Sequence, residues 1–408
     1  GLQAELTDLP TGPTKAIFDD FAFSGTEQPP VWLGEFTPAE GGLKGQTFLV
    51  AVGGTSIWYR NASGWTKSGL VLSANARKGC VGVFNGRLVV GYGDVARAEF
   101  TTDLLAVRPG KDPNGTKLYA WAVTSDRSAA YIAGGQTWTD TNKITSSAEG
   151  GIDYDPTLIV CGSNEDRITG LAPGGGLALI YIGKNTELAC IDNNGIYRSL
   201  IPFDSRLETN CQGLQWVMSA GEDVQRGSVV LVFPRDRSTW LYEPRSDNAG
   251  RARNLSVWAR PGMRPANILG LPTAFQGTAR WLYSVVHHAD GRSWLLKYDT
   301  QGGATHPITA LGSSFCGAMT ITSLFGVNPR LYLVHGTHVA YSIVPLDGEN
   351  PRGDAECRFA TTGTLDLSGI ELNFPDEDKI LFSVRIVADN LAPGQREIDV
   401  YTQEDAAT

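Results

Sequence analysis

The sequence of 408 residues repeats one local pattern, a pair of short apolar strands joined by a tight turn. The clearest copy spans residues 279–299, where two arms rich in aromatic and β-branched residues flank the turn pair Asp290-Gly291. Such a pair can adopt the positive φ angles that a tight turn between two antiparallel strands requires. In the first arm Trp281 and Tyr283 alternate with Leu282, so both faces are apolar. A strand that is apolar on both faces needs one protein layer above it and another below it.

Seven hairpins of this kind follow one another along the chain. The strand pairs are Gln46–Val52 with Thr55–Tyr59, Arg87–Val90 with Arg97–Phe100, Lys117–Val123 with Ala129–Ile132, Leu177–Ile182 with Glu187–Ile191, Ser228–Phe233 with Thr239–Tyr242, Ala279–Val286 with Arg292–Asp299, and Arg330–Val334 with His338–Val344. Their turn centres run from residue 54 to residue 336, six steps with a mean of 47 residues. A four-stranded propeller blade has this size, about 40–50 residues.

The spacing and the two-sided burial together favour a propeller over its rivals. A β-sandwich strand usually alternates apolar and polar residues, and a β-helix repeats at about 20–30 residues. The step between the turns at residues 94 and 126 is only 32 residues, which fits two hairpins within one blade. We therefore predict an all-β chain, a six- or seven-bladed β-propeller followed by a partial β-sandwich segment.

Changes in proline content and in the pattern of apolar residues divide the sequence into three segments. Residues 1–45 are broken by prolines and read as an N-terminal arm or partial blade. Residues 46–350 hold the hairpins of the β-propeller. Residues 351–408 include a strand with true alternation at 379–388, and they read as an incomplete C-terminal β-sandwich-like segment, or as a segment that returns to complete the ring.

Composition excludes some classes of function. The formal net charge is −9 and no basic run occurs, so we expect no nucleic-acid partner. No apolar run approaches the roughly 18 residues that span a bilayer, so we expect no membrane insertion. The first residues are neither basic nor apolar enough for a signal peptide. The sequence begins at Gly rather than Met, which is compatible with a processed start, so secretion stays open.

The cysteines lack metal-site spacing. None forms a CxxC, and no two lie within ten residues of each other. We expect buried free thiols, with one long-range disulfide as the alternative. They are Cys80, Cys161, Cys190, Cys211, Cys316 and Cys357.

Two histidine pairs lie beside hairpin turns. His335 and His338 flank one turn and could face each other as zinc ligands, but the sequence places no third ligand. His287 and His288 are neighbours on a strand, so they point to opposite faces. Both pairs are better read as turn residues.

Carboxylates also gather at turns. Aspartate favours turns because its side chain bonds nearby backbone amides; the alternative is a ring of carboxylates at the mouth of the propeller, as glycosidases need in pairs. The candidates are Asp94, Asp126, Asp153, Asp155, Glu165, Asp166, Asp236 and Asp290. Residues 192–195 resemble half a calcium loop without its later glutamate, and Gly174–Gly176 lacks the Lys-Ser/Thr of a phosphate loop. We assign no catalytic, cofactor-binding or metal-binding residue and expect no cofactor.

One region resembles a known family. The segments Ile168–Pro173, Ala178–Lys184, Glu187–Asp192 and Tyr197–Pro202 resemble a blade of the tail-associated structural propellers of tailed bacteriophages. Residues 84–91 look like the start of a similar blade, and Gly363–Leu367 with Arg385–Ala388 resembles the β-sandwich that often follows such propellers.

The resemblance implies a non-enzymatic structural component of a phage tail or baseplate that contributes to host attachment. Its expected location is the virion, after assembly in the host cytoplasm. Its partners would be other tail proteins, further copies of the chain, and a host surface glycan or protein. The alternatives are a secreted carbohydrate-active enzyme or lectin built on a propeller, and a cytosolic propeller scaffold.

Overall fold

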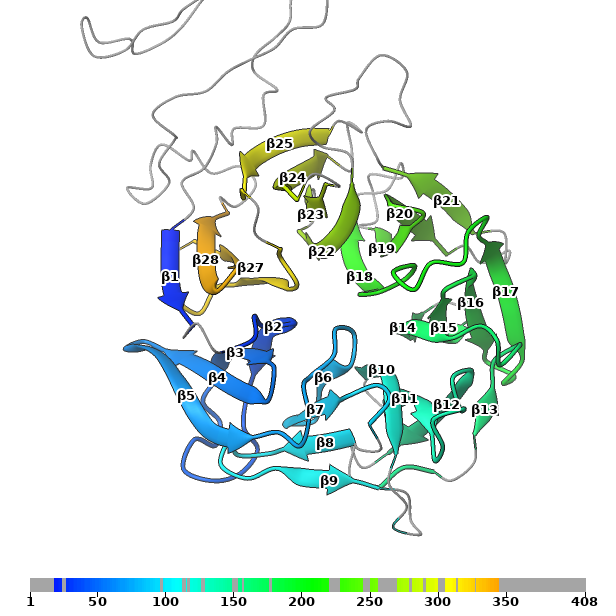
Figure 1. The fold of residues 1–408 in the computed structure, drawn as a ribbon, viewed down its shortest axis with the longest axis horizontal. Coiled ribbons are helices and arrows are strands. Elements are labelled where there is room, and N and C mark those ends of the chain that lie inside the picture. Colours follow the sequence, from blue (N-terminus) through cyan, green and yellow to red (C-terminus); the bar gives the residue numbers. More distant parts are fainter. Residues whose placement is uncertain are drawn as a thin grey trace, which may run out of the picture. The chain divides into compact units, whose positions relative to one another are not determined.

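The computed structural model of the chain describes residues 18–23, 27–95, 98–111, 115, 118–125, 129–148, 153–155, 158–175, 178–219, 228–244, 250–255, 270–278, 281–288, 291–299, 305–312, 315–326 and 328–344. Every regular element within these residues is a β-strand, and they contain no helix able to cross a membrane. The strands form seven four-stranded antiparallel sheets arranged in a ring (Figure 1). The chain is a seven-bladed β-propeller, at the upper limit of the expected blade number.

Each blade starts with a strand near the centre of the ring and runs outward (Figure 1). Blades 1 to 6 are consecutive: β2–β5, β6–β9, β10–β13, β14–β17, β18–β21 and β22–β25. Blade 7 contains β26, β27 and β28, and β1 is its outer strand.

The strands have the following bounds. The innermost are β2 (Trp32–Phe36), β6 (Val81–Phe84), β10 (Tyr119–Ser125), β14 (Ile168–Gly175), β18 (Gln215–Ser219), β22 (Leu271–Gly277) and β26 (Met319–Thr322). The second strands are β3 (Phe48–Gly53), β7 (Arg87–Gly91), β11 (Ala130–Gly135), β15 (Ala178–Lys184), β19 (Ser228–Arg235), β23 (Trp281–His287) and β27 (Arg330–His335). The third strands are β4 (Ser56–Asn61), β8 (Ala98–Thr101), β12 (Lys143–Ser147), β16 (Glu187–Asp192), β20 (Ser238–Glu243), β24 (Ser293–Asp299) and β28 (His338–Ile343). The outer strands are β5 (Gly64–Val71), β9 (Arg108–Gly110), β13 (Ile159–Val160), β17 (Tyr197–Pro202), β21 (Arg251–Asn254), β25 (Thr305–Ala310) and β1 (Phe18–Ala22).

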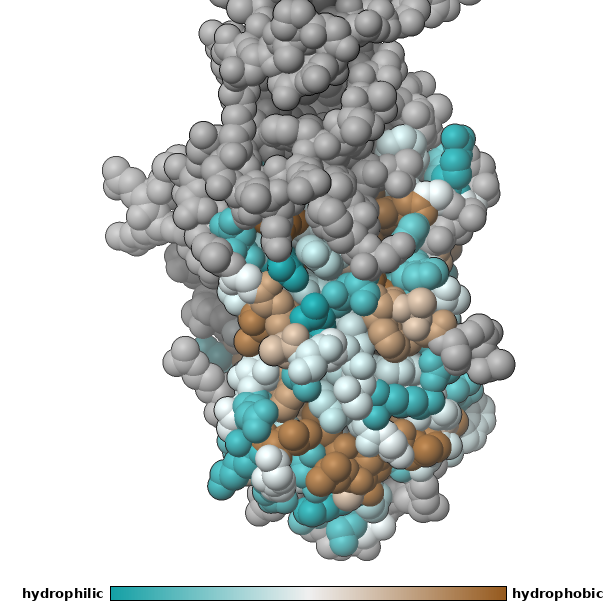
Figure 2. Space-filling view, turned by 90° about the vertical axis from the view of Figure 1, so that its left-hand side faces the viewer, coloured by the Kyte–Doolittle hydropathy of each residue, from teal (hydrophilic) through white to brown (hydrophobic). Residues whose placement is uncertain are grey.

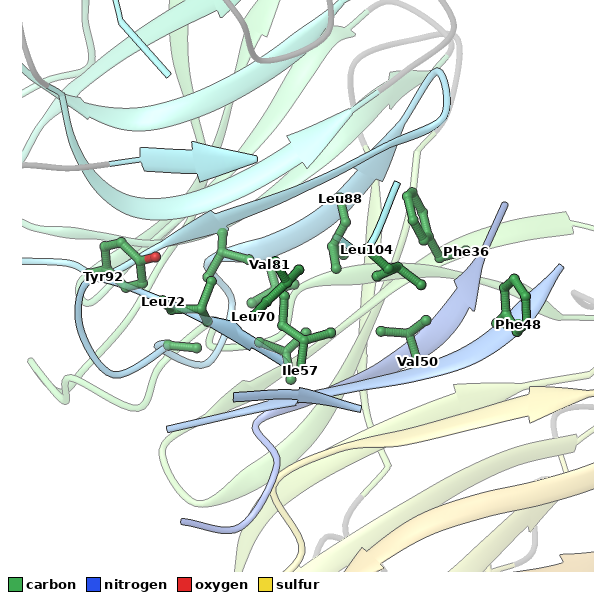
Figure 3. Packing of buried hydrophobic residues seen from close by; sticks show 13 residues of the cluster. Phe36, Phe48, Val50, Ile57, Leu70, Leu72, Val81, Leu88, Tyr92 and Leu104 are labelled. Atoms are coloured by element: carbon green, nitrogen blue, oxygen red, sulfur yellow. The ribbon is translucent and has the colours of Figure 1, made fainter. Parts of the chain in front are cut away.

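The hydrophobic core lies between blades, because successive residues of a central strand point to opposite faces. Val50 and Val52 of β3 pack with Val81 and other residues of blade 2 (Figure 3). Leu49 and Ala51, which alternate with these valines, pack with Tyr332 of blade 7. Similar clusters join each of the five remaining pairs of neighbouring blades. Apolar contacts therefore close the ring all the way round.

The hairpin of β23 and β24 confirms the two-sided burial read from the sequence. Tyr283 and Val285 pack towards Leu331 and Leu333 of blade 7. Leu282, on the other face, packs with residues of blade 5. The strand is therefore a middle layer with apolar residues on both faces.

The two ends of the propeller meet at a seam between blades 7 and 1. Asp20 of β1 accepts hydrogen bonds from Arg60 Nε at 2.6 Å and Arg60 Nη2 at 2.9 Å. It also accepts one from Trp65 Nε1 at 2.5 Å. The Arg60 guanidinium lies 4.1 Å from the centre of the Phe325 ring in blade 7. We call Asp20, Arg60 and Trp65 the seam clasp.

The expected start of the propeller at residue 46 and the sharing of one blade by two hairpins were wrong, whereas the partial-blade reading of residues 1–45 agrees with the positions of β1 and β2. Blade 1 begins at β2 and the seventh blade takes β1, so the propeller starts well before residue 46. The hairpin at residue 126 joins β10 to β11 of blade 3, whereas the hairpin at residue 94 belongs to blade 2. Those two hairpins therefore do not share a blade. The 32-residue step is short because it compares a turn between second and third strands with a turn between first and second strands. Residues 351–408, the expected sandwich segment, lie outside the described residues.

The side of the ring that carries β1 and β5 has a mixed surface. Figure 2 shows small hydrophobic patches there, separated by polar side chains. Val71, at the end of β5, is 75% exposed.

Candidate functional site

The innermost strands of all seven blades, with the linkers before them, surround an axial cavity of about 270 Å³. Its wall combines apolar groups, such as Trp32 and Phe275, with neutral polar groups, such as Gln276 and Thr320. Among the described residues that line this axial cavity, Lys78 alone is charged. A single cation in a neutral enclosure dominates the local potential.

The linker between β5 and β6 presents Lys78 to the cavity. Gly79 adopts a φ of +79°, which favours glycine, and lets the chain turn there. Its carbonyl accepts the Val123 N–H of the neighbouring blade at 2.8 Å. The Cys80 N–H bonds back to Arg77 O at 3.1 Å, and the Cys80 thiol donates to Trp121 O at 2.9 Å. The loop is therefore held on both sides of Lys78.

The Lys78 ammonium reaches across the ring. It donates a hydrogen bond to the backbone carbonyl of Thr273 in β22, which belongs to blade 6. Burial lowers the pKa of Lys78 to about 8, and the Cys316 thiol nearby opposes that shift. A substantial fraction of this lysine is neutral slightly above neutral pH, unlike an ordinary surface lysine.

A second buried lysine has a different environment. Lys184 ends β15 and is fully buried; its ammonium donates to Cys161 O at 2.9 Å and to Ser163 O at 3.3 Å. Glu187 lies 3.9 Å away and accepts a hydrogen bond from the Tyr197 hydroxyl at 2.5 Å. This lysine fastens the linker before blade 4 to the second strand of that blade.

The same structural position is used in two further blades. Arg235, at the end of β19, pairs with Asp204 of the preceding linker at 3.3 Å. His335, at the end of β27, donates from Nε2 to Leu311 O of the preceding linker at 2.6 Å. A long polar side chain at the end of a second strand therefore holds the linker in three blades.

The histidines expected at turns are placed by these contacts. His335 pairs in register with His338 across the turn, but its bond to Leu311 directs it to the linker. His287 Nδ1 lies 2.8 Å from Ser293 Oγ. His288 donates its backbone N–H to Arg292 O at 2.7 Å. Within the described part of the chain, no group of three or more His, Cys, Asp or Glu residues could hold a metal ion.

The Asp192 loop is a turn of the ordinary aspartate type. Its Oδ1 accepts the N–H groups of Asn194 and Ile196, both at 2.9 Å, and its Oδ2 pairs with Arg198 Nε at 2.8 Å. The backbone bond from Ile196 is the main cause that lowers the pKa of Asp192. The loop uses its carboxylate internally, which confirms the turn reading.

The other acidic candidates are dispersed. Asp236 sits in a turn, accepts a hydrogen bond from the Ser205 hydroxyl and donates its N–H to Asn210 Oδ1. Asp166 pairs with Arg206 at 3.0 Å. Asp94, Asp155 and Glu165 are exposed and Asp153 is half-buried, whereas Asp126 and Asp290 lie outside the described residues. None of the described candidates lines the axial cavity.

The cysteines of the described region are buried free thiols, as expected from the sequence. They are Cys80, Cys161, Cys190, Cys211 and Cys316; Cys357 lies outside the described residues. Burial raises the pKa of Cys80, Cys161 and Cys316 to about 12 in each case. Such thiols are poor nucleophiles at neutral pH.

Lys78 was not among the candidate residues expected from the sequence. A lysine in a short loop is ordinarily solvated, and nothing in the neighbouring residues distinguishes this one. Its position became visible only when seven blades placed their inner strands around it.

Comparison with known proteins supports the fold alone. No family model matches the chain, and no curated protein matches it significantly. The structure is similar to the extracellular domain of a putative hybrid two-component system from B. thetaiotaomicron, with a TM-score of 0.52, 10% identity and coverage of 80% of this chain and 39% of that one. A corresponding domain described as a putative one-component system gives 0.53, 11%, 80% and 40%.

A third similar structure is YCF48 bound to D1 peptide, with a TM-score of 0.51, 10% identity and coverage of 83% of this chain and 97% of that one. The chain thus spans about two fifths of the first two structures and matches nearly the whole of the third. At these identities the likeness establishes the class, a seven-bladed β-propeller, and nothing finer.

Proposed function

We propose that this chain is a non-enzymatic structural component of a bacteriophage tail or baseplate. It packs with other tail proteins and with copies of itself in a symmetric assembly located in the virion, and it contributes to attachment at a host surface glycan or protein. The basis for the phage assignment is the sequence resemblance over residues 168–202. Repetition of one ring in many copies would give attachment by many weak contacts made together.

One observation supports the non-enzymatic part of the proposal above all others. Among the carboxylates that a glycosidase reading would recruit, Asp166 pairs with Arg206 and Asp236 accepts a hydrogen bond from the Ser205 hydroxyl, and none of the described candidates lines the axial cavity. A retaining or inverting pair would need two carboxyl groups facing one another across a substrate. In the described residues the axial cavity instead contains a single cation, Lys78.

The surface of the ring suits contacts with other proteins. The side with β1 and β5 mixes small hydrophobic patches and polar groups (Figure 2), as non-obligate interfaces do. YCF48, a structure of similar fold, is described with a bound D1 peptide. A propeller scaffold is therefore compatible with partner binding, and we assign this chain the same general role with its own partners.

Immunogold labelling of particles from the source culture tests the proposal. Antibody raised to this chain should place gold at one end of tailed particles. Particles that carry no gold, with the protein free in the medium, would overturn the proposal. A polysaccharide cleavage screen would then test the carbohydrate-active alternative, for which released reducing sugar is the expected signal.

A further inference from the structure

We propose that the axial cavity binds a carboxylate carried on a short apolar stem, and that Lys78 recognises its charge. This site goes beyond the proposed tail function and does not depend on it. The carboxylate could belong to a free small acid or to the end of a protein segment, because both present the same chemistry to the cavity.

The charge of Lys78 is not balanced by a negative side chain among the described residues that line the cavity. The Lys78 ammonium has three N–H donors, and the described residues provide one hydrogen-bond acceptor, Thr273 O, and no ion pair. A cation withdrawn from water is costly unless it gains a counter-charge. A bound anion would supply that charge.

Comparison with Lys184 strengthens this step. Lys184 is fully buried, whereas Lys78 is half-buried, and the Lys184 ammonium has two backbone carbonyls and the Glu187 carboxylate at 3.9 Å. The chain therefore supplies a counter-charge where a lysine serves only to fasten a linker. Lys78 has no such carboxylate among the described residues and instead lines a cavity of about 270 Å³.

The size and lining of the cavity select the ligand. Its volume lies below the roughly 300–1,000 Å³ of pockets for drug-sized ligands, so a group of a few atoms fits. One lysine matches one negative charge, whereas phosphate is typically held by a fork of arginine donors or several amides. Trp32, Val81 and Phe275 provide apolar wall for a stem, and Thr320 and Gln276 add neutral polar groups.

Ligand-observed NMR with the full chain at pH 7 tests the site, with butyrate as the probe and butyramide as its uncharged match. Butyrate should bind saturably with one site per chain, and butyramide at least tenfold more weakly. Equal binding of the two, or no saturable butyrate binding, would overturn the proposal. This comparison uses the unaltered protein, so it does not depend on any variant folding.

Two variants locate the binding. Lys78→Met keeps the length and apolar stem of the side chain but removes its charge, and should weaken butyrate binding at least tenfold. Lys44→Met removes an exposed lysine far from the cavity lining and should leave the affinity unchanged. Unchanged binding in the Lys78 variant would show that butyrate binds elsewhere and would refute the assignment.

The pH dependence provides an independent readout. Butyrate affinity should fall between pH 7 and pH 9 as Lys78 loses its proton. Among the described residues, the charged and titratable groups beside it are Arg77, Cys80 and Cys316. Burial raises the pKa of the Cys80 thiol to about 12, so this thiol stays protonated over the range. The guanidinium is charged throughout this range, and burial raises the pKa of the Cys316 thiol to about 12. A flat profile would contradict the role of Lys78.

A pair of peptides separates the two sources of carboxylate. A tetrapeptide that ends in valine with a free C-terminus is compared with its C-terminal amide. Tighter binding of the acid than of butyrate would identify a protein terminus as the ligand, and binding of butyrate without the peptide would identify a small free acid. Either result supports a carboxylate site, whereas equal binding of acid and amide peptides would count against it.

Discussion

The ammonium of Lys78 in the linker before blade 2 donates a hydrogen bond to the carbonyl of Thr273 in blade 6, across the centre of the ring. Two segments separated by 195 residues are thereby joined in the axial cavity. Hydrophobic contacts hold each blade to its neighbours, but this bond links blades that are not neighbours. The axial cavity therefore contains a polar contact between opposite sides of the ring in addition to the apolar contacts between neighbouring blades.

Removing the Lys78 charge should stabilise the fold. Burial lowers the folded-state pKa of Lys78 to about 8 from its ordinary 10.5. The unfolded state therefore holds more protons between these values, and the free energy of unfolding of the native protein rises with pH there. We expect Lys78→Met to raise the free energy of unfolding by about 1–3 kcal/mol at pH 7, with the gain shrinking as pH rises from 8 to 10.5. Urea unfolding of both proteins at several pH values measures this.

The matched control for that experiment is Lys44→Met, which should change stability by less than about 0.5 kcal/mol. A Lys78 variant that is less stable than the native chain at pH 7 would contradict the expectation. A difference in the free energy of unfolding between the Lys78→Met variant and the native chain that stays constant with pH would also contradict the expectation.

The other buried lysine should behave in the opposite way. Lys184→Met leaves Cys161 O, Ser163 O and Glu187 without their cation, and unmatched buried polar groups are costly. We expect a loss of about 2–4 kcal/mol in the free energy of unfolding, measured by urea titration at pH 7. A stability equal to that of the native chain would mean that this network contributes nothing net.

Opening the seam clasp should weaken ring closure. Asp20→Ala removes the acceptor of three hydrogen bonds, two from Arg60 and one from Trp65, and leaves a guanidinium that is only 13% exposed without its carboxylate. We expect a loss of about 3 kcal/mol and faster proteolysis near the N-terminus. Thermal denaturation and limited proteolysis measure the two effects.

Glu27→Ala is the comparison variant for the clasp. Its partner Lys67 is 49% exposed, and exposed pairs contribute about 0–1 kcal/mol. If the Asp20 variant lost no more stability than the Glu27 variant, the clasp would have no special part in closing the ring.

The buried thiols should resist modification in the native state. With a Cys357→Ser background, the five remaining cysteines should react with Ellman's reagent at pH 8 only after denaturation, because burial blocks access and raises the pKa of Cys80, Cys161 and Cys316 to about 12. The absorbance change in the presence and absence of urea measures the number of reactive thiols. Rapid reaction of the native protein would indicate that at least one of these sites opens readily.

The hairpins were predictable because their causes are local. In β23 the alternation of Tyr283 and Leu282 makes both faces apolar, and the sequence between the arms favours a tight turn. All seven expected hairpins pair as antiparallel strands. Local pattern and burial point to the same structure at these positions.

Ring closure was not predictable in this way. The segment Phe18–Ala22 contains two aspartates, and nothing in its own residues marks it as a blade strand that pairs with the far end of the propeller. It becomes one because β28 offers an open edge and Arg60 offers a counter-charge, and both lie far away in the sequence. Lys78 was not predictable for the same reason, because the residues around it come from all seven blades and lie far away in the sequence.

The pairing of β1 with β28 also sets an order of events during synthesis. The outer strand of blade 7 leaves the ribosome first, yet its partner appears only after six blades have been made. Until then the early strand has no sheet to join, and blade 7 keeps an unpaired edge that any extended segment can occupy. Once β28 has been made, β1 competes with other extended segments for that edge, and it has the advantage of being tethered to the same molecule.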